Sequence, residues 1–147
     1  MSDPAPAAAE WEGEASPGNL GFVREFVEKR CRAAGSDAQA CFDLKLAVDE
    51  ACTNIMVHGY GGRGDGRMAV AFACEGNRMT VTIRDCGLAF DPETIEVPDF
   101  AGGLDSREPG GLGWHLIRST VDEFHYESDS DGNRLTLVKS ARLPEKP

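Results

Sequence analysis

Apolar residues recur along this chain with two different periods, and each period predicts a different kind of element. In three segments they return every three or four positions, as on one face of a helix. Ser16-Pro17 and Gly35 flank the first of these segments, and Ser36 or Asp37 precedes the second, as expected of helix ends. The three segments predict helices over residues 16–34, 36–58 and 111–122.

A period of two predicts strands in the remaining apolar segments. In residues 68–74 large side chains alternate with alanines, and in residues 79–85 apolar side chains alternate with polar ones. Gly76-Asn77 between these segments is typical of a tight hairpin turn. Further short strands are predicted over residues 8–13 (with Trp11 as anchor), 124–126 and 135–138.

Residues 86–109 show little periodicity and contain Asp-Pro, Pro-Asp and Gly-Gly pairs. A stretch of this length without elements, inside a compact domain, is typical of a functional lid. The length of 147 residues is that of one ordinary domain. We therefore divide the chain into a loose N-terminal tail (1–9), a single domain (10–142) and a C-terminal tail (143–147).

Composition narrows the classes of partner. The net charge of -10, from 25 acidic and 15 basic residues, argues against nucleic acid and against an anionic membrane surface. The five cysteines are widely spaced and form no C-x-x-C pair, as is usual in a reducing cytosol. No apolar run is long enough to span a bilayer, and the first residues do not resemble a secretory signal. We therefore expect a cytoplasmic protein.

Three polar residues share one stripe of the second predicted helix. Glu50, Asn54 and His58 are four positions apart, and their stripe borders the apolar face. A carboxylate so close to the core is costly unless it has a partner or a role. Asn54 offers an oxygen suited to Mg²⁺, and Glu50 could take a proton from a hydroxyl group. The solvated face of an amphipathic helix would carry the same residues, and spacing alone favours that interpretation.

Asp85 ends the predicted strand 79–85 on the side of its apolar residues. An ionisable group on that side is unusual. Such a carboxylate can accept a hydrogen bond from an exocyclic amine, such as that of adenine. Gly87 lies two residues later, where the backbone can come close to a ligand. The alternative is a turn aspartate that bonds to its own backbone.

Glycines lead from the long loop into the third predicted helix. The run Gly110-Gly111-Leu112-Gly113 would expose N–H groups at a helix N-terminus, where the helix dipole favours phosphate. It is not a Walker A loop, because no Gly-Lys-Ser/Thr follows. An ordinary flexible helix entry has the same composition, so the run does not decide between the two.

Two other patterns are discounted. Residues 59–64 fit G-x-G-x-x-G, but they follow a helix and precede a strand, the reverse of the dinucleotide-binding order. We interpret them as a helix exit. The acidic turn 129–133 suggests a calcium loop, but Ser140 stands where that loop needs a glutamate.

In this order, the motifs resemble those of the GHKL ATPase superfamily, and within it the small bacterial anti-sigma factors that are serine-protein kinases. The similarity covers nearly all of residues 11–139. It is carried by 46–54 (LAVDEACTN) with His58 and Tyr60, 85–92 (DCGLAFDP) and 110–117 (GGLGWHLI).

The resemblance implies an α+β fold, a two-layer α/β sandwich with helices on one face of a mixed, mainly antiparallel sheet. It implies Glu50 as general base, Asn54 as the Mg²⁺ ligand and Asp85 as the acceptor for the adenine of ATP. Gly87 would let the base lie against the strand end. Phosphate contacts are implied for the loop and the helix start, at Arg107, Gly110, Gly111, Leu112 and Gly113. For Arg107 an ordinary surface arginine is the alternative.

The resemblance also implies partners, namely a sigma factor and an antagonist protein that accepts phosphate on serine or threonine, together with a homodimeric state. Ala89 departs from the family, which has a second glycine there. Two other functions stay open. One is a non-catalytic nucleotide-sensing module, and the other is a detached ATPase domain of a histidine kinase.

Overall fold

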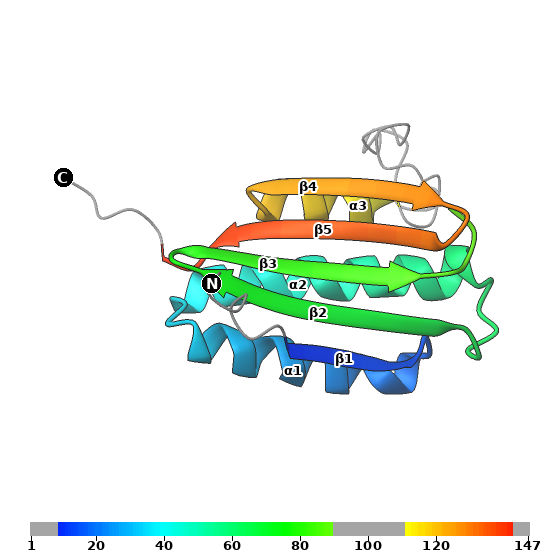
Figure 1. The fold of residues 1–147 in the computed structure, drawn as a ribbon, viewed down its shortest axis with the longest axis horizontal. Helices are drawn as coiled ribbons and strands as arrows, with labels where there is room; N and C mark the ends of the chain where they lie inside the picture. Colours follow the sequence, from blue (N-terminus) through cyan, green and yellow to red (C-terminus); the bar gives the residue numbers. More distant parts are fainter. Residues whose placement is uncertain (1–8, 90–110, 143–147) are drawn as a thin grey trace, which may run out of the picture.

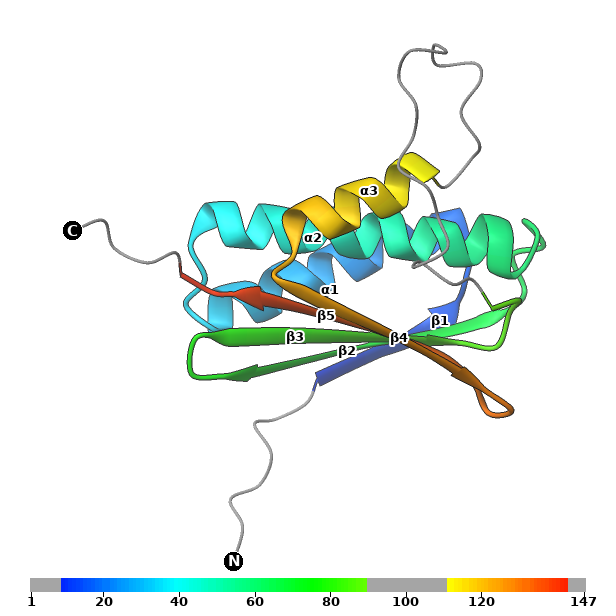
Figure 2. The same ribbon diagram turned by 90° about the horizontal axis from the view of Figure 1, so that it is seen from above.

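The computed structural model describes residues 9–89 and 111–142. Their strands are β1 (Ala9–Glu14), β2 (Arg67–Glu75), β3 (Arg78–Asp85), β4 (Glu123–Asp129) and β5 (Gly132–Ser140). These form one sheet in the order β1-β2-β3-β5-β4, and the helices cover one face of it (Figures 1 and 2). The implied two-layer α+β sandwich is therefore confirmed. Each described pairing is antiparallel, so the sheet is not mixed over these residues.

The helices are α1 (Leu20–Ala33), α2 (Ala38–Asn54) and α3 (Gly111–Thr120). A single 3-10 turn, Pro17–Asn19, precedes α1, and the Ser16 side chain makes no capping hydrogen bond. Gly35, with φ of 74°, follows the end of α1 in the left-handed conformation that glycine adopts without strain. Among the described residues, no helix has both the length and the apolar character needed to cross a membrane.

Asp37 rather than Ser36 caps α2, because its Oδ1 accepts a hydrogen bond of 2.7 Å from the Ala40 N–H. At its other end α2 continues into a π-helical turn, Ile55–Gly59. The N–H of Tyr60 donates to the Ile55 carbonyl five residues earlier, at 2.9 Å. This wider turn was not predicted, because the periodicity of 36–58 fits an ordinary helix end equally well.

The core lies between the helical layer and the sheet. Most side chains that were predicted to face inward on α2, β2 and β3 are buried there, whereas Ile55, Cys74 and Val121 are half-buried and pack against its edge. The largest fully buried side chains come from every layer: Leu44, Met68, Met79, Ile83, Ile117 and Leu137.

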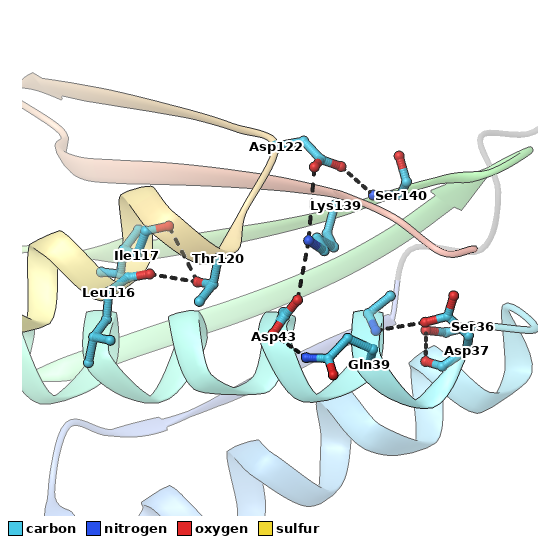
Figure 3. Close-up of polar contacts among 11 residues, drawn as sticks. Ser36, Asp37, Gln39, Asp43, Leu116, Ile117, Thr120, Asp122, Lys139 and Ser140 are labelled. Atoms are coloured by element: carbon cyan, nitrogen blue, oxygen red, sulfur yellow. Dashed lines mark hydrogen bonds and ion pairs between the residues drawn. The ribbon is translucent and has the colours of Figure 1, made fainter. Parts of the chain in front are cut away.

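A buried ion pair connects three elements at the end of the molecule where α2 begins (Figure 3). Lys139 of β5 is 8% exposed, and its Nζ lies 3.4 Å from Oδ2 of Asp43 on α2. The same Nζ lies 3.9 Å from Oδ1 of Asp122, which follows α3. The other carboxylate oxygen of Asp122 accepts a hydrogen bond from the Ser140 N–H at 2.7 Å. Lys139 thus holds β5 to the helical layer.

Candidate functional site

Asp85 is the last residue of β3, is 8% exposed, and points to the helix-facing side of the sheet. One oxygen, Oδ1, accepts hydrogen bonds of 2.9 Å from the Gly87 N–H and from Nδ2 of Asn133. Burial raises the pKa of Asp85, and the two hydrogen bonds oppose that shift. No donor within the described residues reaches Oδ2, so this oxygen can accept a hydrogen bond from a ligand.

The turn after Asp85 is packed directly on the backbone at the end of α2. A Cβ on Gly87 would lie 2.5 Å from the Gly59 carbonyl oxygen, so only glycine fits there without a shift. The Leu88 N–H donates to the same carbonyl at 2.8 Å. The close approach that Gly87 permits is therefore to Gly59, and Gly87 itself does not line the pocket.

Tyr60 fixes this turn from the other side. Its hydroxyl accepts a hydrogen bond of 2.8 Å from the Cys86 N–H and donates one of 2.6 Å to the Arg67 carbonyl. The ring lies against Gly66, where a Cβ would come within 2.4 Å of ring carbons. Two backbone segments, the end of β3 and the start of β2, are thereby tied to one side chain.

The polar stripe of α2 reaches the same region. Asn54, the last residue of α2, is 7% exposed, and its Nδ2 has no hydrogen-bond partner among the described residues. A buried amide N–H without a partner is costly, so Nδ2 is placed to donate to a ligand or to a water molecule. Glu50 lies one turn earlier and is half-buried. Burial raises its pKa, and the neighbouring Asp49 adds to the shift. The solvated-face interpretation therefore does not apply to Asn54.

These elements surround a small pocket whose free volume is about 20 Å³. Two polar side chains, Asn54 and Asp85, face a lining that is otherwise mainly apolar. The chemistry of this lining, rather than the free volume of the pocket, suits a flat ring with a few polar groups. Its other lining residues are Ala51, Ile55, Gly59, Leu88, Trp114, Tyr126 and Leu135.

A second hollow, on the open face of the sheet, is a weaker candidate. It contains three arginines, but each is already paired with a glutamate, and none of the described side chains of α2 or α3 lines it. The arginines of these pairs are Arg67, Arg84 and Arg134.

The structure brings together only some of the predicted site residues. Asn54 and Asp85 share the pocket, while Glu50 is not among its lining residues. His58 lies in the π-helical turn and does not line the pocket either. Gly111, Leu112 and Gly113 form the first turn of α3, and nothing is described of their side chains. Arg107 and Gly110 lie outside the described residues.

Sequence reasoning missed Asn133, which was assigned only to a turn. It is 5% exposed, and its Nδ2 donates to Oδ1 of Asp85 and, at 2.9 Å, to the Gly87 carbonyl. A signal was available, because Asn133 shares the inward side of its strand with Leu135 and Leu137. Tyr60 was noted only within the family resemblance, and its role became visible only in the folded chain.

Known proteins match this chain in sequence and in fold. The profile of a family described as the histidine kinase-like ATPase domain matches residues 13–139. A serine-protein kinase RsbW of Bacillus pumilus is 32% identical over 122 residues, which are 79% of this chain and 75% of that protein. An RsbW of Listeria monocytogenes is 36% identical over 110 residues, covering 72% and 69% of the two chains.

A solved structure agrees with the fold. The crystal structure of the RsbU and RsbW domains of a Mycobacterium tuberculosis protein superposes with a TM-score of 0.66 at 20% identity. The match covers 97% of this chain but only 35% of that longer one.

Proposed function

We propose that this chain, which belongs to the histidine kinase-like ATPase family, is an ATP-binding anti-sigma regulatory factor that phosphorylates an antagonist protein on serine or threonine. One observation supports this proposal above the others. The pocket joins a buried carboxylate, Asp85, to a buried amide without a partner, Asn54. These are the two polar groups that an adenine base and a phosphate-bound metal ion require.

Recognition of adenine is assigned to Asp85. The Gly87 N–H and Asn133 hold Oδ1, which leaves Oδ2 to accept a hydrogen bond from the exocyclic amine of the base. The apolar lining, including Ile55 and Leu135, excludes water from the faces of the ring. Because the pocket is mainly apolar, this one hydrogen bond should favour adenine strongly over bases that lack the exocyclic amine, since such a base would leave the Asp85 carboxylate unpaired.

Asn54 fits a ligand of Mg²⁺ through its amide oxygen, which is a hard donor, while its unpartnered Nδ2 can donate a hydrogen bond to a phosphate oxygen. Bound Mg²⁺ would offset negative charge on the phosphates of ATP. The glycine-rich start of α3, together with Gly110 and Arg107, is proposed to contact those phosphates.

Glu50 is proposed as the general base. It would take the proton from the hydroxyl of the target serine or threonine while that oxygen forms a bond to the γ-phosphorus and ADP departs with the bridging oxygen. Burial shifts the pKa of Glu50 upward, toward neutral pH, and a general base is most effective when its pKa lies near the working pH. Among the described residues no hydrogen bond or ion pair engages it, so its oxygens are available to a substrate.

The proposed partners are a sigma factor, which the chain would hold inactive, and an antagonist, which would be released once it is phosphorylated. A phosphate adds negative charge at an interface, and this favours release from an acidic protein. We propose that the protein acts as a homodimer in the cytoplasm.

The test is transfer of labelled phosphate from ATP with Mg²⁺ to candidate antagonists. Glu50→Ala should lower transfer by about 100-fold or more and leave ATP affinity within roughly threefold of the wild type. Glu25→Ala, an exposed change on α1, is the control and should transfer normally. Transfer at full rate in Glu50→Ala would contradict the assignment of the base.

The same assay separates the two alternatives. Acid-stable label indicates phosphoserine or phosphothreonine, whereas acid-labile label on a histidine domain indicates a detached histidine-kinase ATPase. Stabilisation by ATP with Mg²⁺ in a thermal melt, without transfer to any antagonist, indicates a nucleotide-sensing module. If ATP gives no stabilisation at all, the proposed function is wrong.

A further inference from the structure

The turn between β4 and β5 (residues 129–133) lies against the end of β3, which carries Asp85 (Figure 1). Asn133 is the direct cross-strand partner of Asp85 in the β3–β5 ladder. A Cβ on Gly132, whose φ is 129°, would lie 2.7 Å from the Asp85 carbonyl oxygen. The backbone of the turn therefore packs directly on the backbone of the residue assigned to adenine.

The side chain of Asn133 uses both of its N–H bonds in this contact. Its Nδ2 donates to Oδ1 of Asp85 and to the Gly87 carbonyl, at 2.9 Å in each case. Its Oδ1 accepts a hydrogen bond of 2.7 Å from the Ser128 hydroxyl. Because a primary amide has only two N–H bonds, Asn133 keeps no donor for a ligand, and it does not line the pocket. Its effect on a nucleotide must therefore pass through Asp85.

A purely local role in the turn does not account for Asn133. Turn residues of this kind commonly bond to the backbone of their own turn. Asp129 has that role here, because its Oδ1 accepts a hydrogen bond of 2.8 Å from the Asp131 N–H. Asn133 instead bonds to residues 46 and 48 positions away, and it is only 5% exposed. Its amide is thus committed to the end of β3 rather than to the turn.

The hydrogen bonds on Asp85 restrict its carboxylate. A carboxylate turns easily about its Cβ–Cγ bond, because that torsion is broad. The Gly87 N–H and Asn133 both donate to Oδ1, which fixes the rotation and so determines where Oδ2 points. The bond from Asn133 also lowers the pKa of Asp85, against the effect of burial, and thereby favours the ionised form that only accepts hydrogen bonds.

We propose that Asn133, itself held by Ser128, is a positioning residue that sets the selectivity of the pocket for purines with an exocyclic amine. The proposal rests on the proposed function, because it takes Asp85 as the acceptor for that amine. A carboxylate that is free to rotate distinguishes less well between adenine and a base without the amine. Contacts to the ring faces and to the phosphates are common to both bases, so they do not depend on Asn133.

The test compares two nucleotides by isothermal calorimetry with the full chain and Mg²⁺. One is ATP and the other is the triphosphate of purine riboside, which lacks the exocyclic amine. The wild type should bind ATP roughly 10–100-fold more tightly, as expected of one hydrogen bond to a charged group. Asn133→Leu, which has no donor, should lower this ratio by about tenfold, and Ser128→Ala, at an exposed hydroxyl, by about two- to threefold.

Thr136→Ala is the matched control, because Thr136 lies on the opposite side of β5 from Asn133 and should leave the ratio at the wild-type value. Thermal melts establish that each variant is folded, and should Asn133→Leu not fold, the ratio in Ser128→Ala decides. An unchanged ratio in the folded variants, even with weaker binding of both nucleotides, would overturn the proposal and leave the proposed function intact. A wild type that binds neither nucleotide would contradict the proposed function and this proposal with it.

Discussion

The close contact between Gly87 and Gly59 predicts that a single methyl group added at Gly87 destabilises the fold. In Gly87→Ala the new Cβ would lie 2.5 Å from the Gly59 oxygen, 0.9 Å short of the 3.4 Å at which ordinary contact begins. The next two contacts, at 2.6 and 2.9 Å, are also with Gly59 backbone atoms, which cannot rotate away as a side chain can. The turn after β3 must therefore move off the end of α2.

The cost has two parts. Overpacking of this kind costs about 1–3 kcal/mol, and loss of the 2.8 Å hydrogen bond from Leu88 to Gly59 adds about 1 kcal/mol. A total of about 2–4 kcal/mol lowers the melting temperature of a domain of this size by roughly 6–12 °C. Because Asp85 moves with the turn, ATP with Mg²⁺ should also stabilise the variant much less than the wild type.

The matched control is Gly59→Ala, on the other side of the same contact. Its Cβ would meet Oδ1 of Asp85 at 3.7 Å and Ile55 at 3.8 Å, which are ordinary contacts. The free energy of unfolding, measured by urea denaturation, should therefore stay within about 1 kcal/mol of the wild type. Equal losses in the two variants, or none in Gly87→Ala, would refute the packing argument.

Three further predictions concern polar groups. Tyr60→Phe leaves the Cys86 N–H and the Arg67 carbonyl without their partner, so it should destabilise the chain by about 1–3 kcal/mol in urea denaturation and weaken ATP binding by calorimetry. Lys139→Ala leaves the Asp43 and Asp122 carboxylates without their cation and should lower the free energy of unfolding by about 1–3 kcal/mol, a range that allows for the partial exposure of both carboxylates. The control Lys29→Ala, at an exposed ion pair, should change the free energy of unfolding little. Asp85 has a folded pKa raised above its ordinary 3.8, so its contribution to stability is present below pH 3.8 and is lost as the pH rises through the folded value. The Asp85→Asn variant should therefore become more stable relative to the wild type as the pH rises to 7, and it should lose ATP binding. Thermal melts of both proteins over a pH series measure this difference, and a difference in melting temperature that does not change with pH would contradict the prediction.

The order and faces of the elements could be predicted from local sequence alone. Alternation placed Val81, Ile83 and Asp85 on one side of β3, and the structure finds all three buried. The four-residue spacing of Glu50 and Asn54 was read correctly as one side of a helix. Such periods depend only on the backbone geometry within one segment, so they can be recognised without knowing how the rest of the chain folds.

Contacts between distant segments could not be predicted in this way. The insertion of β5 between β3 and β4, the stacking of Gly87 on Gly59 and the hydrogen bond from Asn133 to Asp85 each join residues far apart in sequence. Periodicity states which way a side chain points, but the partner it meets depends on how the layers close over one core, and that is decided by the packing of the whole chain.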